Sequence, residues 1–184
     1  MRRSIPAVLL ALCALVLSAC FASDKPLIDE ATSVTPLKPG DYVASETKPN
    51  DGDQPTKVRV SVEGSTTVFS SPDKSDDKPD KMFMRKVRGD YYVMLDASDT
   101  SYMYVLVKLE GGGMLMYNFT DACTMLEGIA SAKKKALSEY GVVRIDKQSD
   151  SDTCYFSRFE DLAKASRALI DGGLGEPPTV LKPA

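Results

Sequence analysis

The chain contains no histidine and no tryptophan. Without histidine it cannot form a Ser-His or Cys-His pair, in which an imidazole activates a nucleophile. Several Ser-x-x-Lys segments would allow a serine–lysine dyad, but most lie in polar, loop-like stretches and no Lys-Thr-Gly motif accompanies them. We therefore expect a protein that is not an enzyme and that has no catalytic residues, cofactor or metal.

An excess of positive charge is also missing. The chain has 23 Lys and Arg against 26 Asp and Glu, a formal net charge of -3. A basic face is what a protein uses to hold the phosphates of nucleic acids, so we expect no nucleic-acid partner. Beyond residue 20 no apolar run is long enough to cross a bilayer as a helix.

One apolar run is present, at the N-terminus. Two arginines precede it, and residues 5–17 are almost wholly apolar. Ser18, Ala19 and Cys20 follow it directly. A run this short, with a basic start and small residues after it, is typical of an export signal rather than of a membrane-spanning helix.

The segment Leu17-Ser18-Ala19-Cys20 resembles the lipobox of bacterial lipoproteins. The resemblance implies that diacylglycerol is attached to the Cys20 sulfur, that residues 1–19 are cleaved off, and that the new amino group is acylated. Several acyl chains give stable membrane anchoring, whereas one gives marginal binding. The alternative is an ordinary secretory signal with an incidental cysteine.

Phe21 follows the cysteine, where an Asp retains lipoproteins in the inner membrane of well-studied Gram-negative bacteria. The resemblance therefore implies an outer-membrane lipoprotein, with its domain in the periplasm or at the cell surface. The lead-in "DKPLI…TPLKPGDY" further resembles that of small, uncharacterised proteobacterial outer-membrane lipoproteins with β-rich domains. We expect residues 20–40 to be a lipidated tether and lead-in.

Two cysteines remain, Cys123 and Cys154. Export places them in an oxidising compartment, where an even pair predicts a disulfide. Closing a loop of about 30 residues would stabilise the fold by about 3 to 4 kcal/mol in the chain-entropy model.

The patterning predicts an α+β fold in two parts. Residues 41–120 alternate between apolar and polar positions in short runs separated by turn signals, which predicts an antiparallel β-meander. We expect strands over residues 41–45, 57–64, 66–71, 81–87, 90–96, 101–110 and 114–119.

Residues 121–184 predict a smaller helix-strand-strand-helix half. An apolar stripe predicts one helix from Asp121 to Tyr140, stopped by Gly141. Ser157 and Glu160 have the spacing of a capping box, which predicts the start of a second helix. The tail around residues 177–183 suggests an added edge strand.

Residues 91–95 and 102–107 are apolar on both faces. Helices could cover one face, and the other needs a curl of the sheet into a small barrel, a partner or a ligand. A possible apolar ligand face consists of the methionines Met82, Met84, Met94, Met103, Met114 and Met116. Their soft thioethers would also suit Cu(I), although flexible core filling is the expected role.

We therefore expect a non-catalytic envelope protein, held to the membrane by its N-terminal lipid, that has a structural role or binds a small apolar ligand. The alternative is an inhibitor or accessory subunit of another envelope protein.

Overall fold

A computed structural model describes residues 21–48, 54–73, 78–96, 102–117, 122–147, 152–175, 177 and 179–184. The fold is α+β, as the patterning predicts, and its largest element is a closed antiparallel barrel of eight strands. The barrel strands are β2 (Gly40–Glu46), β3 (Thr56–Glu63), β4 (Thr66–Ser70), β5 (Asp80–Arg88), β6 (Tyr91–Asp96), β7 (Tyr102–Glu110), β8 (Gly113–Tyr117) and β11 (Thr179–Pro183). Each strand pairs with its neighbours in the order β2-β3-β4-β5-β6-β7-β8-β11, and β11 returns to β2.

Strand β11 is not the edge strand that the sequence suggests. It lies between β2 and β8, with Leu181 opposite Ala44 on one side and Met114 on the other. The tail therefore closes the barrel, and closure removes the free sheet edges that an open meander would leave. The two halves predicted from the sequence are therefore not separate, because β11 of the second half is a strand of the barrel formed by the first.

The two apolar faces of β6 and β7 are explained by this closure. Val93 and Leu106 point outward into a core that they share with the helices. Met94 and Val107 alternate with them and point into the barrel. A strand that is covered by helices outside and by the barrel core inside has no polar face to present.

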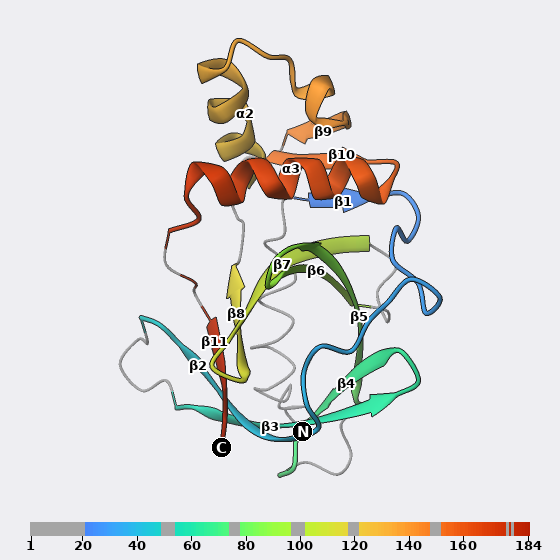
Figure 1. The fold of residues 1–184 in the computed structure, drawn as a ribbon, viewed down its shortest axis with the longest axis vertical. Coiled ribbons are helices and arrows are strands. Elements are labelled where there is room, and N and C mark those ends of the chain that lie inside the picture. Colours follow the sequence, from blue (N-terminus) through green and yellow to red (C-terminus); the bar gives the residue numbers. More distant parts are fainter. Residues whose placement is uncertain are drawn as a thin grey trace, which may run out of the picture.

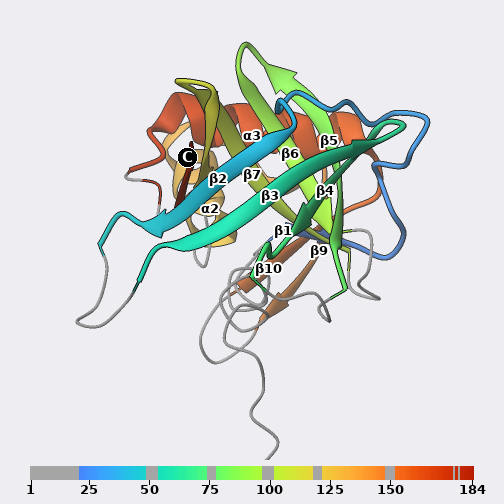
Figure 2. The ribbon, with the colours of Figure 1, turned by 90° about the horizontal axis from the view of Figure 1, so that it is seen from below.

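A small second sheet continues from the barrel. Strand β1 (Phe21–Ser23) pairs antiparallel with the start of β7 and parallel with β10 (Asp152–Phe156), which pairs with β9 (Val142–Lys147). Figure 1 shows β1, β9, β10 and the helices gathered on one side of the barrel. Figure 2 shows β2, β3 and β4 crossing the side opposite helix α3.

The residues expected to form a tether are built into the fold. Phe21 is 2% exposed and meets the ring of Phe156 edge-on, with the ring centroids 5.0 Å apart. Ile28 is fully buried against the helices, and Leu37 is buried in the barrel core. The lead-in thus supplies a strand and two core side chains.

The first predicted helix is divided in two. Helix α2 spans Ala122–Ala132, and a 3-10 helix, η1, spans Leu137–Tyr140. The break is at Lys134, whose φ of 53° is left-handed, and the Lys135 amide donates to the Ala130 carbonyl. This is a Schellman end with lysine at the position that usually needs glycine. The predicted stop at Gly141 is found at the end of η1.

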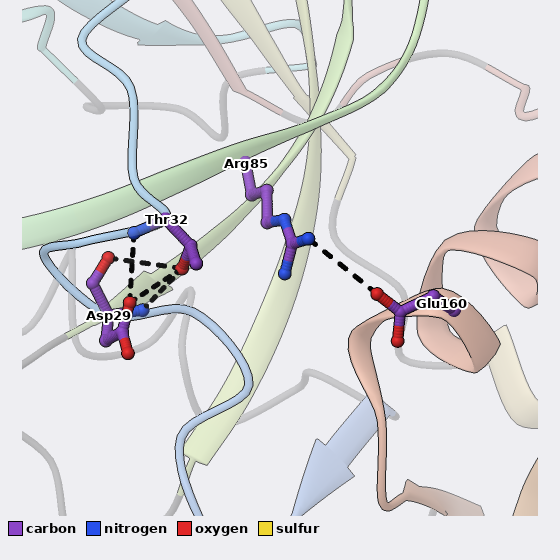
Figure 3. A network of polar contacts seen from close by, with 4 residues as sticks. All are labelled: Asp29, Thr32, Arg85 and Glu160. Carbon is purple, nitrogen blue, oxygen red and sulfur yellow. Dashed lines mark hydrogen bonds and ion pairs between the residues drawn. The ribbon is translucent and has the colours of Figure 1, made fainter.

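Helix α3 (Phe159–Gly172) is confirmed, but it begins without the predicted capping box. Its N-cap is Arg158, and Glu160 lies 3.7 Å from the Arg85 guanidinium of β5 instead (Figure 3). The same guanidinium lies over the Phe159 ring, 3.9 Å from its centroid. Arg85 therefore fastens the start of α3 to the outside of the barrel.

Candidate functional site

The inside of the barrel is the candidate site, because it gathers most of the side chains that the sequence singles out. Eight strands enclose an interior just wide enough for side chains alone or for one small ligand. The barrel core is defined here as the buried cluster and the apolar side chains packed on it: Leu37, Tyr42, Ala44, Val58, Val60, Phe69, Met82, Met84, Tyr92, Met94, Val105, Val107, Leu109, Met114, Met116 and Leu181.

Five of the six predicted methionines meet in this core. Met84 and Met94 lie directly opposite each other on β5 and β6, and Met114 is 1% exposed on β8. Met82 and Met116 complete the set. Unbranched thioether side chains change rotamer at little cost, so a core rich in methionine can rearrange around a guest molecule.

Met103 is the exception. It is half-buried at the start of β7, where its register partner is Ala22 of β1, and it does not belong to the barrel core. Met103 lies outside the barrel core because β7 extends beyond the barrel, and its first residues pair with β1 of the second sheet.

Two threonines on the barrel strands have a buried hydroxyl for which the described residues provide no hydrogen-bond partner. Thr67 is 0% exposed and Thr179 is 5% exposed. Neither Oγ1 atom has a hydrogen-bond partner among the residues that the structure describes. Buried hydroxyls in proteins are nearly always paired with protein or water, so two unpaired ones in one barrel call for an explanation. Threonine is common in β-strands, and nothing in the sequence distinguishes these two.

A segment called here the strap, residues 24–39, lies beside β5 and the β3–β4 turn. The amide of Met84 donates to Ser33 Oγ at 2.9 Å, and the amide of Val34 donates back to the Met84 carbonyl at 2.8 Å. The Ser65 hydroxyl, in the β3–β4 turn, donates to the Glu30 carbonyl. These contacts continue the wall of the barrel beside β5, where β4 pairs only as far as Met82.

The strap is itself ordered by a tight polar turn. Thr32 donates to the Asp29 carboxylate through its amide at 3.0 Å and through its hydroxyl at 2.8 Å, and the Asp29 amide donates to the Thr32 hydroxyl (Figure 3). The hydrogen bonds from Thr32 lower the pKa of the Asp29 carboxyl below its usual value. The turn directs the chain from Ile28, under the helices, to Leu37, in the barrel.

The predicted disulfide is present between Cys123, in the first turn of α2, and Cys154, in β10. Both residues are fully buried in the helix-side core, away from the barrel interior. Their role is therefore to join α2 to the second sheet. Cys20 lies outside the described residues.

Among the described ranges, no group of three or more His, Cys, Asp and Glu side chains is placed to hold a metal ion. Likewise, no helix in the described part of the chain is long and apolar enough to span a membrane.

Comparison with protein-family models, with curated proteins and with solved structures finds no match to this chain.

Proposed function

We propose that this chain is a lipoprotein of the outer membrane, anchored through Cys20, and that its barrel binds one small apolar molecule. The observation that carries the binding role is the content of the barrel. It combines five methionines with two buried hydroxyls that lack a partner in the described residues. A barrel that served only as a scaffold would gain stability from rigid aliphatic side chains and from the absence of unpaired polar atoms.

The position of the anchor supports the same function. The lipobox-like segment ends at Cys20, and the buried strand β1 begins at the next residue, Phe21. No spacer separates the lipidation site from the fold, so the acyl chains would hold the domain directly against the bilayer. A carrier of apolar molecules benefits from this position because its ligands dissolve in the membrane rather than in water.

The binding role is tested on the full chain carrying Cys20→Ala. This change removes the lipid attachment point and leaves three small side chains in a row after the apolar run, which suits cleavage of an ordinary export signal. We therefore expect an exported soluble product that needs no detergent. Native mass spectrometry should detect a co-purified apolar molecule. Diphenylhexatriene, an uncharged hydrocarbon fluorophore, should gain fluorescence with a stoichiometry of about one per chain.

A ligand-free mass together with no fluorescence gain would reject the binding role. The alternative of an inhibitor or accessory subunit would then be the better account of the chain. Cross-linking in intact cells would be the experiment that follows.

A further inference from the structure

The two hydroxyls that have no hydrogen-bond partner among the described residues both belong to the inner face of the barrel. Thr67 lies two residues before Phe69 on β4, and Thr179 lies two residues before Leu181 on β11. Phe69 and Leu181 are both in the barrel core, and side chains two apart on a strand share a face. The inward direction of both threonines therefore follows from the alternation.

Each threonine also faces a methionine across a strand pair. Thr67 is opposite Met82 of β5, and Thr179 is opposite Met116 of β8. Each of these residue pairs is the last one of its strand pairing. The β4–β5 and β11–β8 pairings have only three register positions each. The polar atoms are thus placed beside the most adaptable side chains and where the barrel wall is least extensively paired.

The barrel core offers no charge to a guest. No Asp, Glu, Lys or Arg is among the buried residues in the part of the chain that the structure describes. An ionised group buried among these residues would have no counter-charge, and desolvation would disfavour it strongly. A hydroxyl, by contrast, can donate to a carbonyl or ether oxygen and can accept from another hydroxyl.

Charged residues also occupy positions on the inward-facing rows, at or near the ends of strands. Glu46 is opposite Thr179, and Asp80 is opposite Phe69, so both acids share the inner-face register near one end of the barrel. Lys86, opposite Tyr92, is an exposed cation near the other end, with its Nζ 5.9 Å from the centroid of the Tyr92 ring. The two acids would repel an anion that approaches their end of the barrel. Lys86 would attract an anion at the other end.

We propose that Thr67 and Thr179 are the polar anchors of the barrel site, and that its ligand is an uncharged apolar molecule carrying a hydroxyl or carbonyl oxygen. The inference rests on the proposed binding function and names the chemical class of its ligand. The two hydroxyls, which have no partner in the described part of the chain, would then form hydrogen bonds with the ligand in the complex.

The test is competition against diphenylhexatriene on the full chain with Cys20→Ala. The competitors are 1-decanol and decanoate at pH 8, which share an alkyl chain and differ in charge. We expect decanol to displace the fluorophore at a concentration at least about tenfold lower than decanoate does. Equal or better competition by decanoate would overturn the inference and would point to Lys86.

Variants separate the two hydroxyls from the rest of the barrel. Thr67→Val and Thr179→Val keep the side-chain shape and remove the hydroxyl. For at least one of them we expect the affinity for decanol to fall about three- to tenfold relative to the affinity for the hydrocarbon fluorophore, which has no oxygen to bond. The matched control is Thr153→Val, which changes a buried threonine on β10, outside the barrel.

A second measurement distinguishes a ligand site from a merely structural role. In the absence of ligand, the midpoint of thermal unfolding of each Val variant should rise or stay constant, because an unpaired buried hydroxyl is removed. A lower midpoint with unchanged decanol affinity would show that the hydroxyls serve the fold, through a bound water for example, and would overturn the inference. No fluorophore binding by the parent would overturn the binding function and this inference together, whereas binding without discrimination would overturn the inference alone.

Discussion

The hydroxyl of Tyr104 lies 2.8 Å from Ser23 Oγ, although the two residues are 81 positions apart in the sequence. Ser23 donates its proton to the Lys25 carbonyl, so Tyr104 is the donor to Ser23, and the Leu27 amide donates to Tyr104 at 2.8 Å. Tyr104 itself is 1% exposed. One buried phenol therefore fixes both β1 and the start of the strap to the barrel strand β7.

The first prediction is that Tyr104→Phe lowers the free energy of unfolding by about 1 to 3 kcal/mol. The substitution keeps the ring and removes the hydroxyl, so the Leu27 amide loses its acceptor and Ser23 loses a donor in a buried setting. Urea denaturation followed by circular dichroism measures the change. Tyr102→Phe is the control, since Tyr102 is half-buried on the same face of β7 and its hydroxyl has no partner in the described residues. Equal effects of the two substitutions would contradict the prediction.

The second prediction concerns stability at alkaline pH. Burial raises the pKa of the Tyr104 hydroxyl above its ordinary value of 10.0, although the hydrogen bonds with Ser23 and Leu27 oppose this shift. A group with a raised pKa in the folded state contributes fully below its unfolded pKa, and that contribution is lost as the pH rises toward the folded value. The free energy of unfolding should therefore fall as the pH increases above about 10.

Tyr104→Phe should make this alkaline decline less steep. It should not abolish it, because burial also raises the pKa of Tyr117. Unfolding free energies measured between about pH 8 and pH 11 for the parent, Tyr104→Phe and Tyr102→Phe provide the comparison. A decline of the same slope in all three proteins would show that Tyr104 does not control it.

The third prediction concerns the disulfide. Cys123 and Cys154 are 31 residues apart, and the bond joins the first turn of α2 to the middle strand of the second sheet. Changing both residues to alanine should lower the free energy of unfolding by about 3 kcal/mol. Thiol labelling of the denatured, unreduced parent should detect no free cysteine in the mature chain. Two labelled thiols per chain would show that the bond is not formed in the cell.

The strand pattern could be predicted because each barrel strand alternates or is apolar on both faces, and both signals are local. The closure of the barrel could not be, because it depends on which strand the tail joins. The segment around Val180 has the same apolar character as an edge strand would have. Its place between β2 and β8 follows only from the long-range pairing of Leu181 with Ala44 and Met114.

The break in the first helix shows the same limit. Residues 121–140 carry a continuous apolar stripe. Lysine has a high propensity for the right-handed helix, so nothing local predicts a left-handed conformation within this stretch. In the fold, η1 packs against α3, and the Lys164 ammonium donates to the Glu139 carbonyl near the end of η1. Tertiary contacts thus overcome local propensity at Lys134, which no window of the sequence reveals.

The candidate site was only partly visible in the sequence. Methionines two residues apart on a strand share a face, so Met82 with Met84, and Met114 with Met116, could be grouped from spacing alone. Thr67 and Thr179 could not be found in this way. They stand out because their hydroxyls find no hydrogen-bond partner in the described ranges, and this depends on the tertiary packing around them.

The last prediction concerns the anchor. Because β1 starts at Phe21, a lipid on Cys20 would be attached to the folded domain itself. The parent protein should fractionate with membranes, and its N-terminal peptide should carry the mass of several acyl chains, which stable anchoring requires. Cys20→Ala should move the protein to the soluble fraction and should leave the described core, which includes Phe21, folded. Ser18→Thr, which leaves the cysteine in place, is the matched control and should remain membrane-bound. A parent chain without acyl groups, or a Cys20→Ala chain that stays with the membranes in its processed form, would show that the cysteine is incidental to an ordinary secretory signal.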